Sequence, residues 1–142
     1  MKLSDAVIEK LHRPTFWHFV TLTPHAIPHV RPVWVDEDDG FILVNTGAGW
    51  QKERNARANP CVALSMVELS NPYERVEIRG HVVDFIEGES ADVQLDQLAT
   101  RYLGLETYPW KRPREKRVII RIEPMQVVHH IDSDDPHTLP VA

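Results

Sequence analysis

The sequence predicts a mainly β protein, a six- to seven-stranded antiparallel barrel with accessory helices. Short apolar stretches alternate with turns that contain Pro, Gly, Asn or Asp, as in all-β proteins. One long strand pattern, residues 73–86, shifts its inward phase by one residue just after Gly80, which is typical of a β-bulge. Only residues 90–103 show a long helical period. Strongly bent strands with few helices are typical of small barrels.

The first part of the chain is predicted to form a short helix and three strands. Ser4 can cap a helix that ends before Pro14. Strands are expected at residues 16–23, 29–35 and 41–46, and Pro32 marks the second as an edge strand or a bulge because it cannot donate to a ladder. The acidic run at residues 36–40 indicates a turn that ends at Gly40.

The remainder is predicted to form two helices and three or four strands. A helix follows the loop after the third strand and stops at residues 59–60, before a strand at 61–68. The strand at 73–86 leads to the helix at 90–103, with Ser90 as its cap and Gly104 as its terminator. Strands are expected at 117–122 and 126–131. We expect residues 1–131 to be one domain and residues 132–142 to be a frayed tail.

Composition and net charge limit the classes of function that the protein can have. The chain of 142 residues has a net charge of -5, which argues against broad nucleic-acid binding. No apolar run approaches the roughly 20 residues of a membrane-spanning helix, so a soluble, cytoplasmic protein is expected. Cys61, the only cysteine, is expected to be a buried, inert thiol. The eight histidines show no convincing metal-ligand spacing, so no metal site is predicted.

Positive charge is concentrated in residues 52–57 and 111–117. In the first cluster, Gly47 and Gly49 allow backbone N–H groups to approach an anion, and Lys52 in the first helical turn can reach the same anion. Helical geometry makes Lys52 and Asn55 neighbours and puts Arg54 and Arg57 on another side. The alternative is a solvated helix supported by a Glu53–Arg57 pair.

Five segments, taken in order, resemble the flavin and deazaflavin oxidoreductases of the pyridoxamine-phosphate-oxidase-like split-barrel superfamily. They are residues 26–35 (AIPHVRPVWV), 45–46 (NT), 52–55 (KERN), 59–64 (NPCVAL) and 72–80 (PYERVEIRG). The resemblance covers about residues 10–131 and is closest to the branch that depends on coenzyme F-420, a deazaflavin.

The resemblance implies a homodimer of split β-barrels with two cofactor sites at the interface, each lined by both subunits. It implies backbone contacts to the cofactor ring from Pro32, Val33 and Trp34, and a phosphate end held by Thr46, Lys52, Arg54 and Asn55. The sequence departs from the family at residues 25–28, where members usually have Asp-Gly-Arg-Pro. It also lacks the arginine-rich C-terminal signature of true pyridoxamine-phosphate oxidases, so we do not expect that activity.

Aromatic residues in loops near these segments are candidate walls of the ring and substrate pocket: Trp50, Tyr73, Tyr108 and Trp110. Ordinary packing is the alternative for each, and Trp110 is the strongest candidate.

The predicted function is hydride transfer from reduced coenzyme F-420 to an unsaturated small-molecule acceptor. The cofactor carries the difficult chemistry, so no nucleophile or catalytic dyad is needed, and the catalytic residues remain unassigned. FMN is the alternative cofactor. The deazaflavin is favoured because its lactyl and oligoglutamate tail suits the basic run at residues 111–117. The alternatives are an FMN-dependent enzyme of the same fold and a non-catalytic binding or storage protein.

Overall fold

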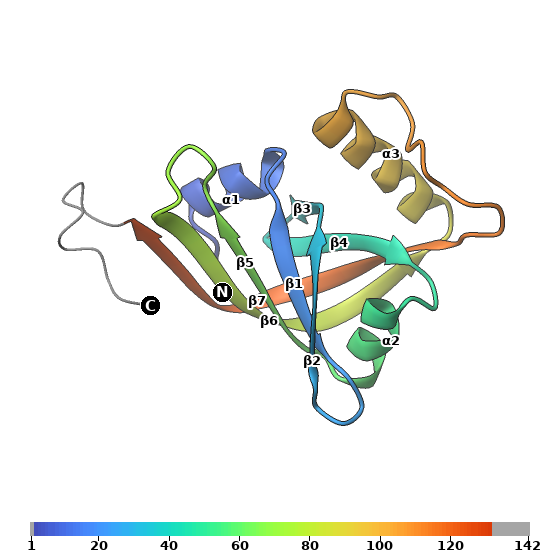
Figure 1. The fold of residues 1–142 in the computed structure, drawn as a ribbon, viewed down its shortest axis with the longest axis horizontal. Helices are drawn as coiled ribbons and strands as arrows, with labels where there is room; N and C mark the ends of the chain where they lie inside the picture. Colours follow the sequence, from blue (N-terminus) through green and yellow to red (C-terminus); the bar gives the residue numbers. More distant parts are fainter. Residues whose placement is uncertain (1, 132–142) are drawn as a thin grey trace.

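The structure, a computed structural model, describes residues 2–131, and the tail predicted at residues 132–142 lies outside them. Seven antiparallel strands form one sheet, which confirms the mainly β class. The strands are β1 (Trp17–Leu22), β2 (Pro28–Val33), β3 (Val35–Asp38), β4 (Phe41–Gly47), β5 (Cys61–Val67), β6 (Glu74–Glu87) and β7 (Arg117–Ile131). The helices of the described residues are α1 (Asp5–His12), α2 (Gln51–Ala58) and α3 (Glu89–Leu103) (Figure 1).

The order of the strands shows that the sheet curls into a barrel. In the order β2-β1-β5-β6-β7-β4-β3, β2 and β3 are opposite edges, yet only Trp34 separates them along the chain. Two residue steps span at most about 7 Å, so the two edges must lie side by side. No ladder joins β2 to β3 in the described sheet. The barrel is therefore open along this junction, as a split barrel is, and we call this opening the split.

Two register shifts bend the longest strand pair. In the β6–β7 ladder they fall between Arg79 and Gly80 and between Val82 and Asp84, which confirms the bulge predicted beside Gly80. A Cβ atom on Gly80 would lie 2.4 Å from the side chain of Ile122, so this close approach requires glycine.

The barrel core is apolar and is closed at one end by α1. Inward side chains of the strands, among them Trp17 and Phe19, are fully buried. Leu3, Val7 and Leu11 add an apolar face to the same cluster. Ser4 accepts a hydrogen bond from the Val7 amide, so the predicted cap of α1 is confirmed.

The longest helix, α3, packs on the outside of the barrel. Its buried residues are Ala91, Gln94, Leu95, Leu98 and Ala99, and Ala91 packs with Leu43 of β4 and Ile119 of β7. Gly104 ends the helix in the left-handed conformation, as predicted. No helix within residues 2–131 combines the length and apolar character needed to cross a membrane.

Five local predictions are wrong. The strand predicted at residues 29–35 is broken at Trp34, and the segment read as a turn forms β3 before the turn at Asp39 and Gly40. The last two predicted strands are one strand, because the bulge beside Gly80 accommodates Pro124. α3 begins after Gly88 rather than at Ser90. Cys61 is exposed because it lies on the outward face of β5.

Candidate functional site

A cavity of about 310 Å³ lies at the split. Pro32, Val33 and Trp34 line it, which are the residues that end β2 and cross to β3. Its polar lining residues are Asn45, Lys52 and Arg117, and its other lining residues are Phe16, Leu95, Leu98, Tyr108 and Trp110. We call it the split cavity. It has a cationic end and an aromatic end.

The cationic end is electrostatically unbalanced. Burial, and to a smaller extent the charges of Arg117 and Arg31, lower the pKa of Lys52 to about 8. Within residues 2–131, neither Lys52 nor Arg31 forms an ion pair. Burial, followed by the charges of Arg31 and Lys52, lowers the pKa of His29. The Nδ1 atom of His29 is buried and has no hydrogen-bond partner in the described chain. Cations gathered without a counter-charge are suited to an anionic ligand.

The register of the β1–β2 pair shows which side chains of β2 point toward the cationic end. His29 and Arg31 lie opposite Thr21 and Phe19 of β1, both fully buried. Directly opposed residues of an antiparallel pair point to the same face, so His29 and Arg31 are on the inward face of this edge strand.

Arg117 is held firmly at the start of β7. Its side chain is only 5% exposed. Its Nε donates to Asn45 Oδ1 at 2.8 Å, and its Nη1 lies 3.2 Å from Glu115 Oε2. The guanidinium also faces the rings of Trp50 and Tyr108, at 5.1 and 5.5 Å from their centres.

Trp34 anchors the aromatic end. Its ring stacks on Tyr102 of α3, with centroids 4.9 Å apart and planes 13° apart. Tyr108 and Trp110 lie at 6.0 and 6.5 Å from it. The Tyr102 hydroxyl donates to the Thr15 carbonyl and accepts from the Val35 amide. These two hydrogen bonds hold the Tyr102 ring in its stack on Trp34. The wall therefore has a preset shape suited to a planar ring.

The loop after β4 positions Trp50 rather than binding an anion through its amides. A Cβ atom on Gly47 would lie 2.2 Å from the Trp50 ring, so glycine is required for the ring to pack there. The amides of Ala48, Gly49 and Trp50 already donate to other groups within the chain. The prediction that the glycines expose these three amides to a phosphate is therefore wrong.

Other predicted phosphate ligands lie away from the cavity lining. Thr46 is fully buried, and its Oγ1 has no partner within residues 2–131. Asn55 is also buried, and its amide donates to Thr21 and accepts from Gln51, which fastens α2 to β1. Arg54 is exposed and bonds Gln51. Their roles toward a ligand stay predictions, as does that of Tyr73, which is 52% exposed before β6.

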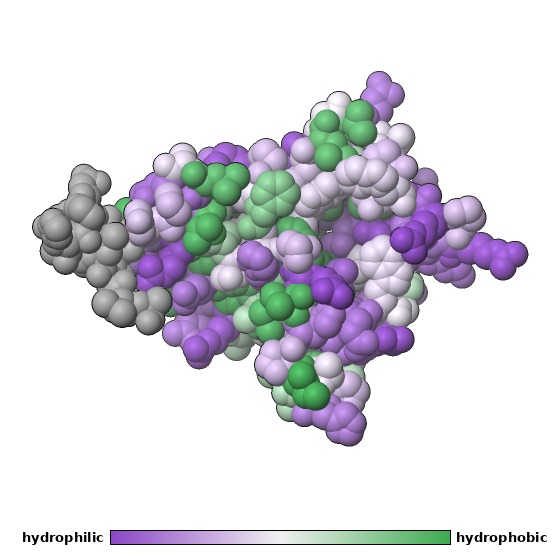
Figure 2. Space-filling view, in the orientation of Figure 1, coloured by the Kyte–Doolittle hydropathy of each residue, from purple (hydrophilic) through white to green (hydrophobic). Residues whose placement is uncertain are grey.

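A basic groove of about 320 Å³ adjoins Trp50. Its lining residues are Ala48, Trp50, Arg112, Pro113, Arg114, Glu115 and Lys116. Glu115 is turned toward Arg117, so it offers little counter-charge to the groove. Arg114 has a φ of 68°, which is uncommon for a long side chain and is typical of functional loops. Hydrophilic side chains gather over this loop at the right of the view in Figure 2.

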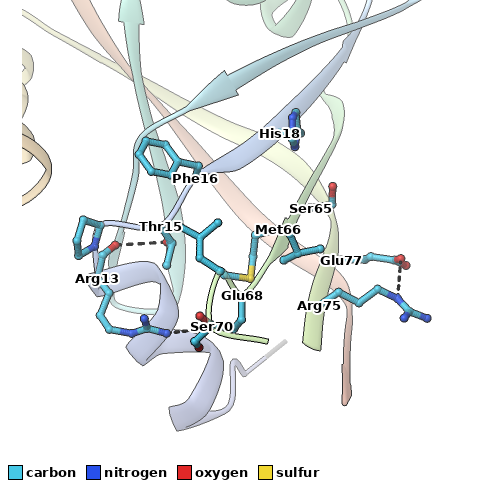
Figure 3. Close-up of a pocket in the computed structure, with 13 residues that line it drawn as sticks. Arg13, Thr15, Phe16, His18, Ser65, Met66, Glu68, Ser70, Arg75 and Glu77 are labelled. Carbon is cyan, nitrogen blue, oxygen red and sulfur yellow. Dashed lines mark hydrogen bonds and ion pairs between the residues drawn. The ribbon is translucent and has the colours of Figure 1, made fainter. Parts of the chain in front are cut away.

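A larger cavity, of about 490 Å³, lies on the outward face of β1, β5 and β6, and we call it the sheet-face cavity. Phe16 lines both it and the split cavity, so the two adjoin. Figure 3 shows its charges paired, Arg13 with Glu68 and Arg75 with Glu77. Because these pairs neutralise it, the sheet-face cavity lacks the cationic imbalance of the split cavity.

Sequence reasoning missed three contributors to the site. Arg117 was counted only as part of a basic run, although its place at the start of a predicted strand was a usable signal. Arg31 lies within the segment that carries the resemblance, but its approach to Lys52 depends on the barrel closing. Tyr102 lies within the helix predicted at residues 90–103, and nothing local indicates that it stacks on Trp34.

Comparison with known families identifies the class. The chain matches the Pyridoxamine 5'-phosphate oxidase family over residues 3–131 and belongs to it. A comparison with curated proteins found no match.

Solved structures of this superfamily share the fold. A protein named "F420 Reductase" is 29% identical, with a TM-score of 0.76, over 89% of this chain and 98% of its own. The heme storage protein HutZ of Vibrio cholerae is 17% identical, with a TM-score of 0.62, over 91% and 95%. A FAD-binding protein of Mesorhizobium loti is 19% identical, with a TM-score of 0.57, over 88% and 90%. The same fold is thus found in proteins named as a reductase, a heme storage protein and a FAD-binding protein.

Proposed function

We propose that the split cavity binds coenzyme F-420 and that the protein transfers a hydride from the reduced coenzyme to an unsaturated small-molecule acceptor. One observation carries the proposal: Lys52, which has no ion-pair partner among the described residues, lines a single cavity together with Arg117 and a preset aromatic wall. A ligand that suits both ends has a planar ring and an anionic group. The 29% identity to an F420 reductase over 98% of that protein supports this choice.

Buried polar atoms without a hydrogen-bond partner are suited to a phosphate at the cationic end. His29 Nδ1, beside Lys52 and Arg31, has no partner in the described residues. Thr46 Oγ1 has none either, but Thr46 lies outside the cavity lining. Buried polar groups are nearly always paired in native proteins, so unpaired ones at a cavity end suggest a missing ligand. Lys52 and Arg31 would hold the phosphate by charge, with His29 available as a neutral partner.

The basic groove favours the deazaflavin over FMN. FMN ends at its phosphate, whereas coenzyme F-420 continues into a lactyl and oligoglutamate tail with several carboxylates. Trp50 lines the groove, and both Lys52 and Arg117 approach its ring, so the groove begins where the phosphate site ends. Arg112, Arg114 and Lys116 would then meet the tail carboxylates.

The chain's own contribution is binding, alignment and exclusion of water. When bound, the reduced coenzyme supplies the hydride. Trp34 and Trp110 would form walls against which the ring and the acceptor are aligned, and Trp110, 60% exposed, offers a free face for this. Leu95 and Leu98 of α3 keep that end of the cavity dry.

We also propose that the protein is a homodimer whose subunits meet through the outward face of β1, β5 and β6. Along β6 the outward charges alternate in sign as Arg75, Glu77 and Arg79, and Arg75 lies 3.6 Å from Glu77, so this face presents little net charge to a second copy related by a two-fold axis. Apolar side chains border these charges, including Val67, 50% exposed, and Phe16, 54% exposed. In Figure 2, green apolar patches alternate with hydrophilic ones on the side that shows β1 and β5. Phe16 links this face to the split cavity, so each site would be completed by the partner.

Two other functions stay open to test: an FMN-dependent enzyme, and a binding protein that turns nothing over, as the likeness to a heme storage protein allows. The deciding experiment mixes reduced coenzyme F-420, protein and a panel of quinones, enones and tetrapyrroles, and follows the return of the oxidised coenzyme's absorbance. We expect at least one acceptor to accelerate oxidation. No acceleration by any acceptor would favour the binding protein.

A further inference from the structure

The loop of residues 104–116, which joins α3 to β7, carries two rings of the split cavity, Tyr108 and Trp110. Tyr108 is half-buried, whereas Trp110 is 60% exposed. The Tyr108 ring meets the ring of Trp110 edge to face, with centroids 5.7 Å apart, and meets that of Trp34 in the same way at 6.0 Å. The guanidinium of Arg117 lies 5.5 Å from its centre. Tyr108 therefore joins the loop to the rest of the aromatic end.

Polar side chains on one side of α3 fasten this loop to the helix. The three contacts are Thr100 Oγ1 with the Leu105 carbonyl at 2.7 Å, Asp96 Oδ1 with the Tyr108 amide at 2.9 Å, and Asp92 Oδ1 with Lys111 Nζ at 2.8 Å. The helix residues are spaced four apart, so they lie on successive turns of one side. As the loop positions rise the helix positions fall, so the loop runs back along α3, beside which Figure 1 draws it.

The contact between Asp96 and Tyr108 is the one that places a cavity ring. Asp92 and Lys111 form an exposed ion pair, which contributes little. Asp96 is half-buried, and its carboxylate accepts from a main-chain amide, so this hydrogen bond is charge-assisted and fixes the backbone itself. Where the Tyr108 ring lies therefore depends on Asp96.

Trp34 does not depend on the loop in this way. It follows directly on β2, and its ring stacks on Tyr102 of α3. The Tyr102 hydroxyl is bonded to the main chain at Thr15 and Val35, both outside the loop. The aromatic end thus has a fixed wall at Trp34 and a second wall that the loop supplies.

We propose that Asp96 is a positioning residue that holds Tyr108 and Trp110 as the wall for the acceptor, and that this wall selects flat, conjugated acceptors. This inference rests on the proposed function. The faces of aromatic rings are complementary to other planar π-systems, and contact grows with the area of the acceptor. A ring held by a fixed backbone also aligns the acceptor at no cost in ordering the loop.

The proposed contacts of the coenzyme are separate from this wall. Lys52 lies on α2, Trp34 is held by Tyr102, and the basic groove is lined by residues 112–116, beyond the last contact with α3 at Lys111. Freeing residues 105–111 from α3 should therefore weaken the use of the acceptor and leave binding of the coenzyme nearly intact.

The test variant is Asp96→Ala, which removes the oxygen that accepts from Tyr108 while keeping the helix, because alanine has the highest helix propensity. Asp96→Asn keeps an oxygen for the amide and is the conservative partner. Glu106→Ala removes an exposed carboxylate of the same loop and is the control for lost charge. Steady-state kinetics with reduced coenzyme F-420 and quinones of one, two and three fused rings give kcat and KM, and fluorescence titration gives the dissociation constant of the coenzyme.

We expect Asp96→Ala to raise the KM of the acceptor about three- to thirty-fold, most for the largest quinone that the wild-type protein reduces. The kcat and the dissociation constant of the coenzyme should change by less than about two-fold. Asp96→Asn and Glu106→Ala should stay close to the wild-type protein. Without any ligand, near-ultraviolet circular dichroism should show loss of the coupled-ring signal in Asp96→Ala and its retention in Asp96→Asn.

An unchanged KM in Asp96→Ala would overturn the positioning role, and an equal loss of coenzyme binding would overturn the separation of the two walls; both leave the proposed function standing. A wild-type protein that reduces no acceptor would overturn the proposed function instead. The near-ultraviolet signal then decides the placement of Tyr108 by itself, and a signal kept in Asp96→Ala would contradict it. If the thermal midpoint shows that Asp96→Ala is unfolded, Tyr108→Leu removes the wall directly, and an unchanged KM in that variant would overturn the proposal.

Discussion

The Nζ atom of Lys52 lies 5.2 Å from the centre of the Trp50 ring. This cation–π contact is modest, of order 0.5–1 kcal/mol or a little more when desolvated. It does not offset the loss of water and the repulsion from Arg117 and Arg31, which together bring the pKa of Lys52 down to about 8. Lys52 is thus held in a site that is unfavourable for its own charge, and a bound anion would relieve that cost.

Replacing Lys52 tests the cofactor contact directly. A charge-assisted hydrogen bond contributes roughly 1.5–3 kcal/mol, so Lys52→Ala should weaken binding of coenzyme F-420 about ten- to a hundred-fold. Fluorescence titration of the coenzyme measures this. Lys2→Ala, at an exposed lysine before α1, is the matched control and should change nothing. An unchanged dissociation constant for Lys52→Ala would mean that Lys52 is only a surface lysine.

The ligand-free protein should become more stable when Lys52 loses its charge. Because the pKa of Lys52 is about 8 in the folded protein and the ordinary lysine pKa is 10.5, the unfolded chain holds a proton that the folded protein lacks between these pH values. The contribution of Lys52 to the free energy of unfolding therefore rises with pH across this window, and its full cost is present below about pH 8.

Lys52→Met removes that cost and keeps the aliphatic volume. At pH 7 we expect it to raise the free energy of unfolding by about 1–3 kcal/mol, after allowance for solvent screening. Urea denaturation at pH 7 and pH 10 should show that the gain shrinks at the higher pH. Added inorganic phosphate should also shrink the gain at pH 7 by stabilising only the wild-type protein. A gain that is constant with pH would show that Lys52 is not strained by its charge.

Gly47 should be replaceable only if Trp50 is replaced as well. The Cβ atom of an alanine would lie 2.2 Å from the ring, and overpacking of this kind costs about 1–3 kcal/mol. We expect Gly47→Ala to displace Trp50 and to weaken cofactor binding along with stability. Combined with Trp50→Leu, the same change should cost much less. Free energies of unfolding for the four proteins measure the coupling, and strictly additive effects would show that the two residues do not interact.

A charge on the outward face of β5 should break the proposed dimer. Val67 is 50% exposed, so Val67→Lys should cost a monomer little but should place an unpaired charge in the interface of a dimer. Light scattering coupled to gel filtration should report a dimer for the wild-type protein and a monomer for this variant. Val93→Lys, at a 48% exposed valine on α3, should remain dimeric. A monomeric wild-type protein at micromolar concentration would refute the proposal.

The fold was largely predictable from the sequence because its strongest signals are local. The bulge beside Gly80 is visible as a change of phase, and the caps at Ser4 and Gly104 follow from residue type. The break of a strand at Trp34 was not predictable, because it is caused by barrel closure rather than by any residue next to it.

The candidate site was predictable in part. Lys52 and the run from Pro32 to Trp34 were recognised through the family resemblance, and they do line one cavity. Arg31 and Arg117 reach Lys52 from strands distant in sequence, and no local pattern reports such an encounter. The requirement for Gly47 comes from the Trp50 ring that packs against it, a contact that no local sequence pattern reports.

The central claim is that the split cavity binds a deazaflavin. Parallel fluorescence titrations of the purified protein with coenzyme F-420 and with FMN, at the same ionic strength, test it most directly. We predict saturable binding of both, with coenzyme F-420 bound at least ten-fold more tightly because its tail carboxylates meet the basic groove. Tighter binding of FMN would contradict the choice of cofactor, and binding of neither would contradict the account as a whole.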